Sequence, residues 1–186
     1  MVKAIIFDFF GVICPDLHEV WTTKHHLPAS IYDEIGRDVD LGRAPEEAYL
    51  EMLSRKSGLP TTQIRDELDR EVVINHALME LIKKLKKDYK IGLLSDASAS
   101  VLNTIIDEQD LRKYFDVIGV SSMIRSTKPH PASYKFVLER LMVVPPEAVF
   151  IDDNPANVSG AKKIGMKGIL FTGMESLKRE LEQLGI

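Results

Sequence analysis

The sequence contains only one cysteine, Cys14, among its 186 residues. A lone cysteine excludes an internal disulfide and is typical of proteins kept in a reducing compartment. No apolar run approaches the ~20 residues that a membrane-spanning helix requires, and the N-terminus leads into a strand-like run without a charged leader. We therefore expect a soluble, cytoplasmic protein without a membrane partner, in which Cys14 is a small core residue.

The sequence also has no excess of basic over acidic residues. The chain has 24 Lys and Arg residues against 28 Asp and Glu residues, for a net charge of −4, and neither sign is concentrated in one stretch. Binding a phosphate backbone requires a basic face, so we expect no nucleic-acid partner. The 45% hydrophobic and 28% charged residues are ordinary for a globular protein with a sizeable core.

The chain does contain short apolar runs that end in polar residues. The first run, Ala4 to Phe7, is followed at once by Asp8. From Lys90 onward, four more apolar runs alternate with helical patterns, and these runs cover residues 91–94, 117–120, 148–151 and 168–171. This alternation predicts an α/β fold, with a Rossmann-like parallel sheet that has helices on both faces.

Between Gly11 and Lys90 no strand-like run occurs. The expected helices cover residues 17–25, 29–38, 45–56, 62–73 and 76–87. Pro45 is expected at the first position of the third helix and Gly58 at its end, and Asn75 is expected to cap the fifth. Proline and glycine separate most of them, as in loops between short helices. We predict a small α-helical cap over residues 14–75, inserted into a core domain formed by residues 1–13 and 76–186.

Five polar residues stand where strands are expected to end. Asp8, Ser95 and the pair Asp152-Asp153 follow strands directly, and Lys128 follows another strand after a loop. Ligands of open parallel sheets bind at the carboxyl ends of the strands, so we expect these side chains to converge. Carboxylate oxygens suit a hard cation such as Mg²⁺, and a hydroxyl and an ammonium beside it suit phosphoryl oxygens. A carboxylate there could attack phosphorus and form an acyl phosphate.

Four segments resemble, in order and spacing, the four motifs of the haloacid dehalogenase-like hydrolase superfamily. They are Phe7-Asp8-Phe9-Phe10-Gly11-Val12, Leu93-Leu94-Ser95-Asp96, Lys128-Pro129-His130-Pro131 and Ile151-Asp152-Asp153-Asn154-Pro155-Ala156-Asn157-Val158. The match spans nearly the whole chain. The helical segment resembles the small cap of the subgroup that carries its cap between the first and second motifs. The resemblance implies a Mg²⁺-dependent hydrolase of a small phosphorylated metabolite.

The resemblance also implies a role for each matching residue at the substrate. Asp8 would be the nucleophile. Ser95 and Lys128 would bind the phosphoryl oxygens, and Lys128 would also screen the negative charge against Asp8. Asp96 follows the motif serine and is expected beside the substrate.

For the metal, the resemblance implies a ligand set built largely of oxygen atoms from two strands. Asp8 and Asp153 would be the two protein carboxylates on Mg²⁺. The backbone carbonyl of Phe10 would be a further ligand, a role that any side chain permits. Asp152 would hold a metal-bound water.

Phe10 departs from the family pattern. Phosphatases of the family usually carry a second aspartate at this position, which protonates the leaving oxygen and then activates water. Loss of a general acid typically costs a factor of ~100 to 10,000 in rate. We therefore expect slow turnover, or restriction to good leaving groups such as those of sugar 1-phosphates, unless Asp16 or an acid of the cap takes the role.

Two further positions differ from relatives. Asp96 stands where asparagine is common, and a carboxylate cannot donate a hydrogen bond to an anion. It would favour a substrate hydroxyl or amine, or it caps the following helix. His130 stands where aspartate is common and is expected on the surface of a turn, while Trp21 and Tyr49 are expected to pack within the helical cap.

Three functions stay open. The first is a Mg²⁺-dependent phosphatase that works through Asp8. The second is a metal-independent haloacid dehalogenase, since that branch also lacks the second aspartate and has an aromatic residue there. Against it, the adjacent carboxylates of Asp152 and Asp153 would, without a cation, repel each other and discourage an anionic haloacid. The third is a binding or regulatory member with weak or no turnover.

Overall fold

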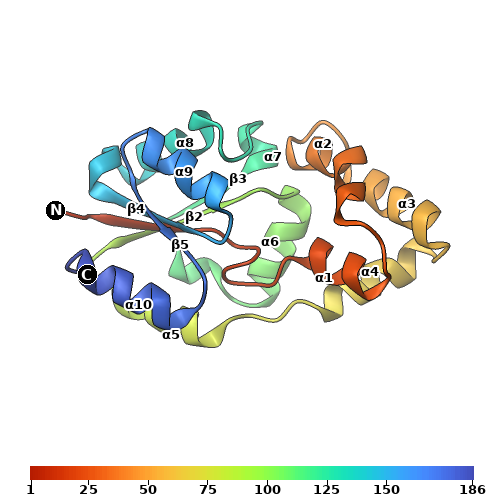
Figure 1. Cartoon of the computed structure of the whole chain (residues 1–186), viewed down its shortest axis with the longest axis horizontal. Helices are drawn as coiled ribbons and strands as arrows, with labels where there is room; N and C mark the ends of the chain where they lie inside the picture. The colour runs from red at the N-terminus through yellow and green to blue at the C-terminus, as the bar shows by residue number, and fades with distance from the viewer.

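The computed structural model describes all 186 residues and contains one five-stranded parallel sheet (Figure 1). Its strands are β1 (Ala4–Phe7), β2 (Lys90–Ser95), β3 (Val117–Val120), β4 (Ala148–Asp152) and β5 (Lys167–Leu170). They lie in the order β3-β2-β1-β4-β5, and every neighbouring pair is parallel. The predicted α/β class is confirmed, with β1 in the centre and the strand order reversing beside it.

Helices cover both faces of the sheet. Successive residues of β1 point to opposite faces, so the apolar residues of this strand need a helical layer on each side. Ala4 and Ile6 pack with α8 (Pro131–Leu141) and α9 (Pro155–Lys163), whereas Ile5 and Phe7 lie in the larger apolar cluster on the other face. That larger cluster contains side chains of α5 (His76–Leu85), α6 (Ala99–Glu108) and α10 (Met174–Gln183). All four residues of β1 are fully buried, which explains their continuous apolar sequence.

The segment between β1 and α5 consists entirely of helices and loops. Its elements are α1 (Leu17–Lys24), the 3₁₀ helix η1 (Ala29–Glu34), α2 (Gly36–Asp40), α3 (Glu46–Ser57) and α4 (Thr61–Arg70). Figure 1 shows them gathered at one end of the molecule, beyond the ends of the strands. All of them except α2 contribute to a separate apolar cluster, formed by Trp21, Ile31, Leu50, Met52, Leu53 and Ile64.

Some predicted boundaries were wrong in this helical segment. The single helix expected over residues 29–38 is interrupted at Ile35, whose φ of −149° ends the 3₁₀ helix and precedes α2. Pro45 is the N-cap of α3 and not its first residue, and α4 ends at Arg70, short of residue 73. The predicted caps at Asn75 and Gly58 are confirmed: the Asn75 side chain accepts from the Leu78 amide at 3.1 Å, and Gly58 has a φ of 75°.

The remaining elements are short. Helix α7 (Ser121–Ile124) and the 3₁₀ turns η2 (Arg112–Tyr114) and η3 (Pro145–Glu147) had no counterpart in the prediction. Cys14 is buried in the larger apolar cluster, as expected. None of the helices is both long and apolar enough to cross a lipid bilayer.

Candidate active site

Three charged side chains meet at the carboxyl edge of the sheet. Asp8 follows β1, Asp152 ends β4, and Lys128 lies in the loop before α8. The Lys128 Nζ atom lies 2.7 Å from Asp8 Oδ1 and 2.8 Å from Asp152 Oδ2, and all three side chains are buried. The convergence predicted from the strand ends is therefore present as a buried ammonium between two carboxylates.

Burial and charge act against each other in this cluster. Burial raises the pKa of Asp8 well above its usual value, while the Lys128 charge lowers it in part. Burial alone would lower the pKa of Lys128, but the charges of Asp8 and Asp152 outweigh that effect and raise it. Lys128 therefore stays an ammonium at any physiological pH, and it can hold a second anion beside Asp8.

Asp152 is fixed by hydrogen bonds on both oxygens. It accepts from the Asn154 amide at 2.8 Å, from Asn157 Nδ2 at 3.1 Å to each oxygen, and from Lys128 at 2.8 Å. These bonds hold the Asp152 carboxylate in one orientation beside Lys128.

The carboxylates also form a set that fits a hard cation. Oxygen atoms of Asp8, Asp152 and Asp153 lie within 4.8 Å of one another. Gly11 has a φ of +82°, and a Cβ at this position would lie 2.2 Å from Asp153 Oδ2, so the turn after β1 approaches Asp153 as closely as glycine allows. The backbone carbonyl of Phe10 accepts no hydrogen bond in the protein. These oxygens suit Mg²⁺ in type and number.

Ser95 is the last residue of β2 and Asp96 follows it, and the two side chains lie in different environments. Ser95 is fully buried, and its Oγ has no hydrogen-bond partner. Asp96 accepts from the Lys128 backbone amide at 3.1 Å with each oxygen, and Ser98, not Asp96, occupies the N-cap of α6. The alternative of a helix-capping Asp96 is therefore wrong: the carboxylate holds the loop that carries Lys128, a link that the sequence alone did not indicate.

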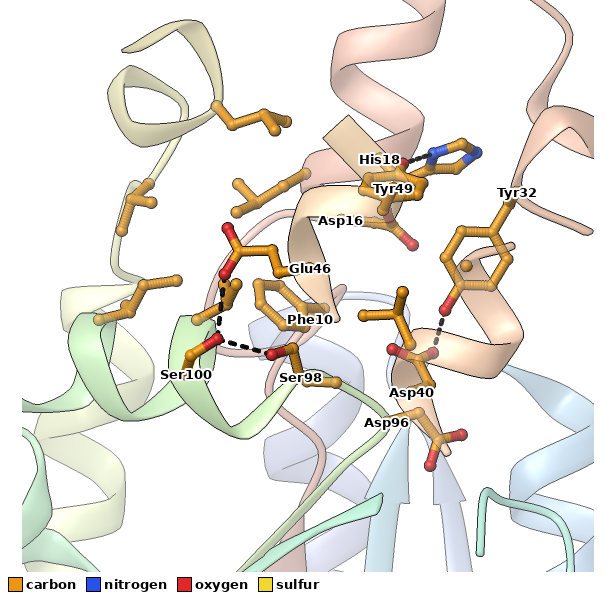
Figure 2. Close-up of a pocket in the computed structure, with 18 of the residues that line it drawn as sticks. Phe10, Asp16, His18, Tyr32, Asp40, Glu46, Tyr49, Asp96, Ser98 and Ser100 are labelled. Carbon is orange, nitrogen blue, oxygen red and sulfur yellow. Dashed lines mark hydrogen bonds between the residues drawn. The ribbon is translucent and has the colours of Figure 1, made fainter. Parts of the chain in front are cut away.

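A cavity of about 1070 Å³ lies between this edge of the sheet and the helical segment. Its core-side lining includes Asp8, Phe10, Asp96, Lys128 and Asp153. The helical segment contributes Asp16, His18, Tyr32, Asp40 and Tyr49, several of which are drawn in Figure 2. Ser95 and Asp152 are fully buried and are not among its lining residues.

Contacts within the helical wall were missed by the sequence reasoning. The His18 ring is hydrogen-bonded to the Tyr49 hydroxyl, and the Tyr32 hydroxyl donates to Asp40 (Figure 2). Tyr49 thus lines the cavity, whereas Trp21 is buried and donates to Glu67 at 3.1 Å, as expected of a packing residue. No spacing in the sequence could indicate these pairs, because their partners sit on different short helices.

Comparison with known proteins assigns the fold to a family. A model described as haloacid dehalogenase-like hydrolase matches residues 2–165. The chain belongs to the haloacid dehalogenase-like hydrolases. The four motif segments of the resemblance all lie within this match. In the structure these segments lie at the carboxyl edge of the parallel sheet, where the carboxylate cluster is found.

One relative among these hydrolases is a phosphorylated carbohydrates phosphatase of Thermotoga maritima. Its sequence is 29% identical over 185 residues, and the alignment covers 90% of this chain and 84% of the relative. Another is an (S)-2-haloacid dehalogenase of Xanthobacter autotrophicus, 34% identical over 97% of this chain and 80% of the relative. A family enzyme of Bacteroides thetaiotaomicron, solved with magnesium and inorganic phosphate, has a TM-score of 0.72 at 20% identity, covering 91% and 94% of the two chains. Several other relatives are longer, and this chain spans 14% to 37% of them.

Proposed function

We propose that this hydrolase is a Mg²⁺-dependent phosphatase of small phosphate monoesters that works through a phosphoaspartate on Asp8. The observation that carries the proposal is the buried Lys128 ammonium, 2.7 Å from Asp8 and 2.8 Å from Asp152, at the base of a cavity large enough for a small metabolite. The T. maritima relative named for phosphorylated carbohydrates and the B. thetaiotaomicron enzyme solved with magnesium and phosphate support it.

The metal would be held by this chain's own oxygens. Asp8, Asp153 and the backbone carbonyl of Phe10 are the proposed direct ligands, and Asp152 is proposed to bind a water of the metal. When bound, Mg²⁺ would neutralise charge on the phosphoryl oxygens and on Asp8. Gly11 contributes by letting the turn approach Asp153.

The protein groups divide the remaining work. Asp8 attacks phosphorus as the bond to the alcohol oxygen breaks. Lys128 holds a phosphoryl oxygen and keeps Asp8 and the phosphoryl group from repelling each other. Ser95 donates its hydroxyl, which has no protein acceptor, to another phosphoryl oxygen. Asp96 is proposed to position Lys128 through the backbone and to face the alcohol part of the substrate.

Residues 14–75 are proposed to act as a cap over a core of residues 1–13 and 76–186. Their separate apolar cluster and their contribution to one wall of the cavity support this division. Substrate selection would then lie in the cap wall. Phe10 offers no proton beside Asp8, so esters with poor leaving groups depend on an acid elsewhere in the cavity or turn over slowly.

The test is an assay with p-nitrophenyl phosphate and a panel of sugar phosphates, with Mg²⁺ and with EDTA. We expect weak, Mg²⁺-dependent hydrolysis by the wild type, none by Asp8→Asn, and wild-type rates from Asp88→Asn, which alters an exposed aspartate away from the site. Acid quenching and mass spectrometry should find a phosphate adduct on the peptide that contains Asp8. Wild-type activity in Asp8→Asn would reject the covalent mechanism, and turnover by Phe10→Asp alone would favour a non-catalytic binding role.

A second candidate is a 2-haloacid dehalogenase that uses Asp8 on carbon. The 34% identity to the X. autotrophicus enzyme and the aromatic Phe10 favour it. The adjacent Asp152 and Asp153 oppose it, because without a cation these two carboxylates would repel each other and a haloacid carboxylate. Release of halide from 2-chloropropionate in the presence of EDTA would establish this candidate in place of the phosphatase.

A further inference from the structure

One acid in the helical wall of the cavity is part-buried and also has a carboxylate oxygen without a partner in the protein. Asp40, the last residue of α2, lines the same cavity as Asp8 and Phe10. Its Oδ2 accepts a hydrogen bond from the Tyr32 hydroxyl, and its Oδ1 makes no hydrogen bond within the protein. In Figure 2 this second oxygen is turned away from Tyr32, toward the side on which Phe10 lies.

The backbone fixes Asp40 against the core. Ser121 Oγ donates to the Asp40 carbonyl at 2.6 Å and accepts from the Ala97 amide at 2.9 Å, one residue after Asp96. One core hydroxyl thus joins the end of α2 to the loop that follows β2. The Asp40 side chain is therefore held at the junction of the two walls.

We propose that Asp40 is the general acid and base of the phosphatase reaction, acting from the helical wall because Phe10 provides no acid beside the nucleophile. This inference rests on the proposed function and names the group that protonates the departing alcohol. It also predicts that alkyl phosphates are substrates.

Other acids of the cavity are already engaged or lie at its rim. Asp16 is exposed, unlike the part-buried Asp40, and one of its oxygens accepts from the Glu19 amide at 2.9 Å as the N-cap of α1. Both Asp96 oxygens accept from the Lys128 amide. The two oxygens of Glu46 accept from Arg65 at 2.7 Å and from Ser100 at 3.0 Å. The exposed acids at the rim are Asp33, Glu47, Asp69 and Glu108.

The surroundings of Asp40 suit proton transfer near neutral pH. Burial raises the pKa of Asp40 to about 7; the Tyr32 hydrogen bond lowers it, the Asp96 charge raises it and the Lys128 charge lowers it. A group with a pKa near the working pH can both give and take a proton. The ionisable groups that face it are Tyr32, Tyr49, Asp16, Asp96 and Lys128.

The two half-reactions balance through this one carboxyl group. In the first, an Asp8 oxygen bonds to phosphorus, the bond from phosphorus to the alcohol oxygen breaks, and the Asp40 proton moves to that oxygen. In the second, the Asp40 carboxylate takes a proton from water, the water oxygen bonds to phosphorus, and the bond from phosphorus to Asp8 breaks. Inorganic phosphate leaves, and Asp40 is again protonated.

The test compares Asp40→Asn with the matched control Asp38→Asn, which alters a half-exposed aspartate of the same helix outside the cavity. Each is assayed with glycerol phosphate, whose alkoxide needs a proton, and with p-nitrophenyl phosphate, whose phenolate does not. We expect kcat/KM of Asp40→Asn for the alkyl ester to fall ~100 to 10,000-fold, with less than a ~10-fold fall for the aryl ester. Asp38→Asn should match the wild type on both.

A pH profile supplies a second readout. Wild-type kcat/KM for glycerol phosphate should fall as pH rises through about 7, where Asp40 loses its proton. This limb should disappear in Asp40→Asn. In Tyr32→Phe it should move to higher pH, because the hydrogen bond that lowers the pKa of Asp40 is gone.

Equal losses on the two esters, unchanged alkyl hydrolysis in Asp40→Asn, or an unmoved limb in Tyr32→Phe would each overturn the role of Asp40. The phosphatase proposal would survive any of these results, since Mg²⁺-dependent aryl hydrolysis would remain. Absence of hydrolysis of either ester by the wild type would reject the proposed function and this inference together.

Discussion

Replacing Lys128 with methionine removes the ammonium that lies between two buried carboxylates. Its Nζ atom is 2.7 Å from Asp8 and 2.8 Å from Asp152. At an effective dielectric constant of ~20, each of these contacts is worth about 6 kcal/mol of attraction before desolvation is subtracted. The measured cost of breaking a buried ion pair by removing one partner is ~3 to 5 kcal/mol. For a chain of this size, that loss lowers Tm by about 6 to 20 °C.

The fall in Tm caused by Lys128→Met should grow as the pH rises. The pKa of Asp8 is already raised by burial, and removing the Lys128 charge that lowers it raises this pKa further. A carboxyl group whose pKa is higher in the folded than in the unfolded protein stabilises the fold at low pH, and this contribution is lost as pH rises toward the folded pKa. The difference in Tm between wild type and Lys128→Met should therefore be smaller at pH 5 than at pH 8, with the contact between Lys128 and Asp152 lost at both.

Circular dichroism melts in EDTA at the two pH values measure this difference. Lys135→Met, which alters an exposed lysine of α8, is the control and should match the wild type. An unchanged Tm in Lys128→Met at pH 8, or equal losses at pH 5 and pH 8, would refute the reasoning that Lys128 compensates buried negative charge.

Three other substitutions test the site and the cap. Ser95→Ala should leave Tm unchanged or slightly raised, because its Oγ has no partner, while KM for p-nitrophenyl phosphate rises about 10-fold or more; a large fall in Tm would contradict this. Gly11→Ala should cost ~1 kcal/mol or more and weaken Mg²⁺ binding measured by calorimetry, because its Cβ would meet Asp153; wild-type affinity would argue against the close approach. Trp21→Phe should lower the free energy of unfolding in urea by ~1 to 3 kcal/mol through the lost bond to Glu67, and unchanged stability would contradict this.

The sheet and the charged cluster could be predicted because their signals are local. Asp8 directly follows an apolar strand, and so does the Asp152-Asp153 pair, so the parallel arrangement alone brings them to one edge. Two helix ends were predictable for an equally local reason. Gly58 adopts the left-handed conformation that ends α3, and Asn75 supplies the side-chain oxygen that caps α5.

The cavity wall could not be predicted because it depends on how short helices dock. Asp40 pairs with Tyr32 within the helical segment, and its carbonyl accepts from Ser121, far along the chain in an unpredicted helix. Asp96 accepts hydrogen bonds from the backbone amide of Lys128, and a pattern of side chains in the sequence cannot predict a backbone partner. Such contacts follow from tertiary packing, and hydrophobic periodicity carries no information about them.

The central place of β1 also sets the order in which the protein can be completed during synthesis. Ile5 is synthesised well before its two partners, because it pairs with Ile91 on one side and Val149 on the other. Contacts between such distant residues form slowly, whereas the helical segment can bury Trp21 against neighbours made soon after it. Until β4 emerges, the fully apolar β1 lacks half of its partners and needs protection from aggregation. The strand that precedes Asp8 is therefore made before both of its neighbours and is enclosed only when the second of them arrives.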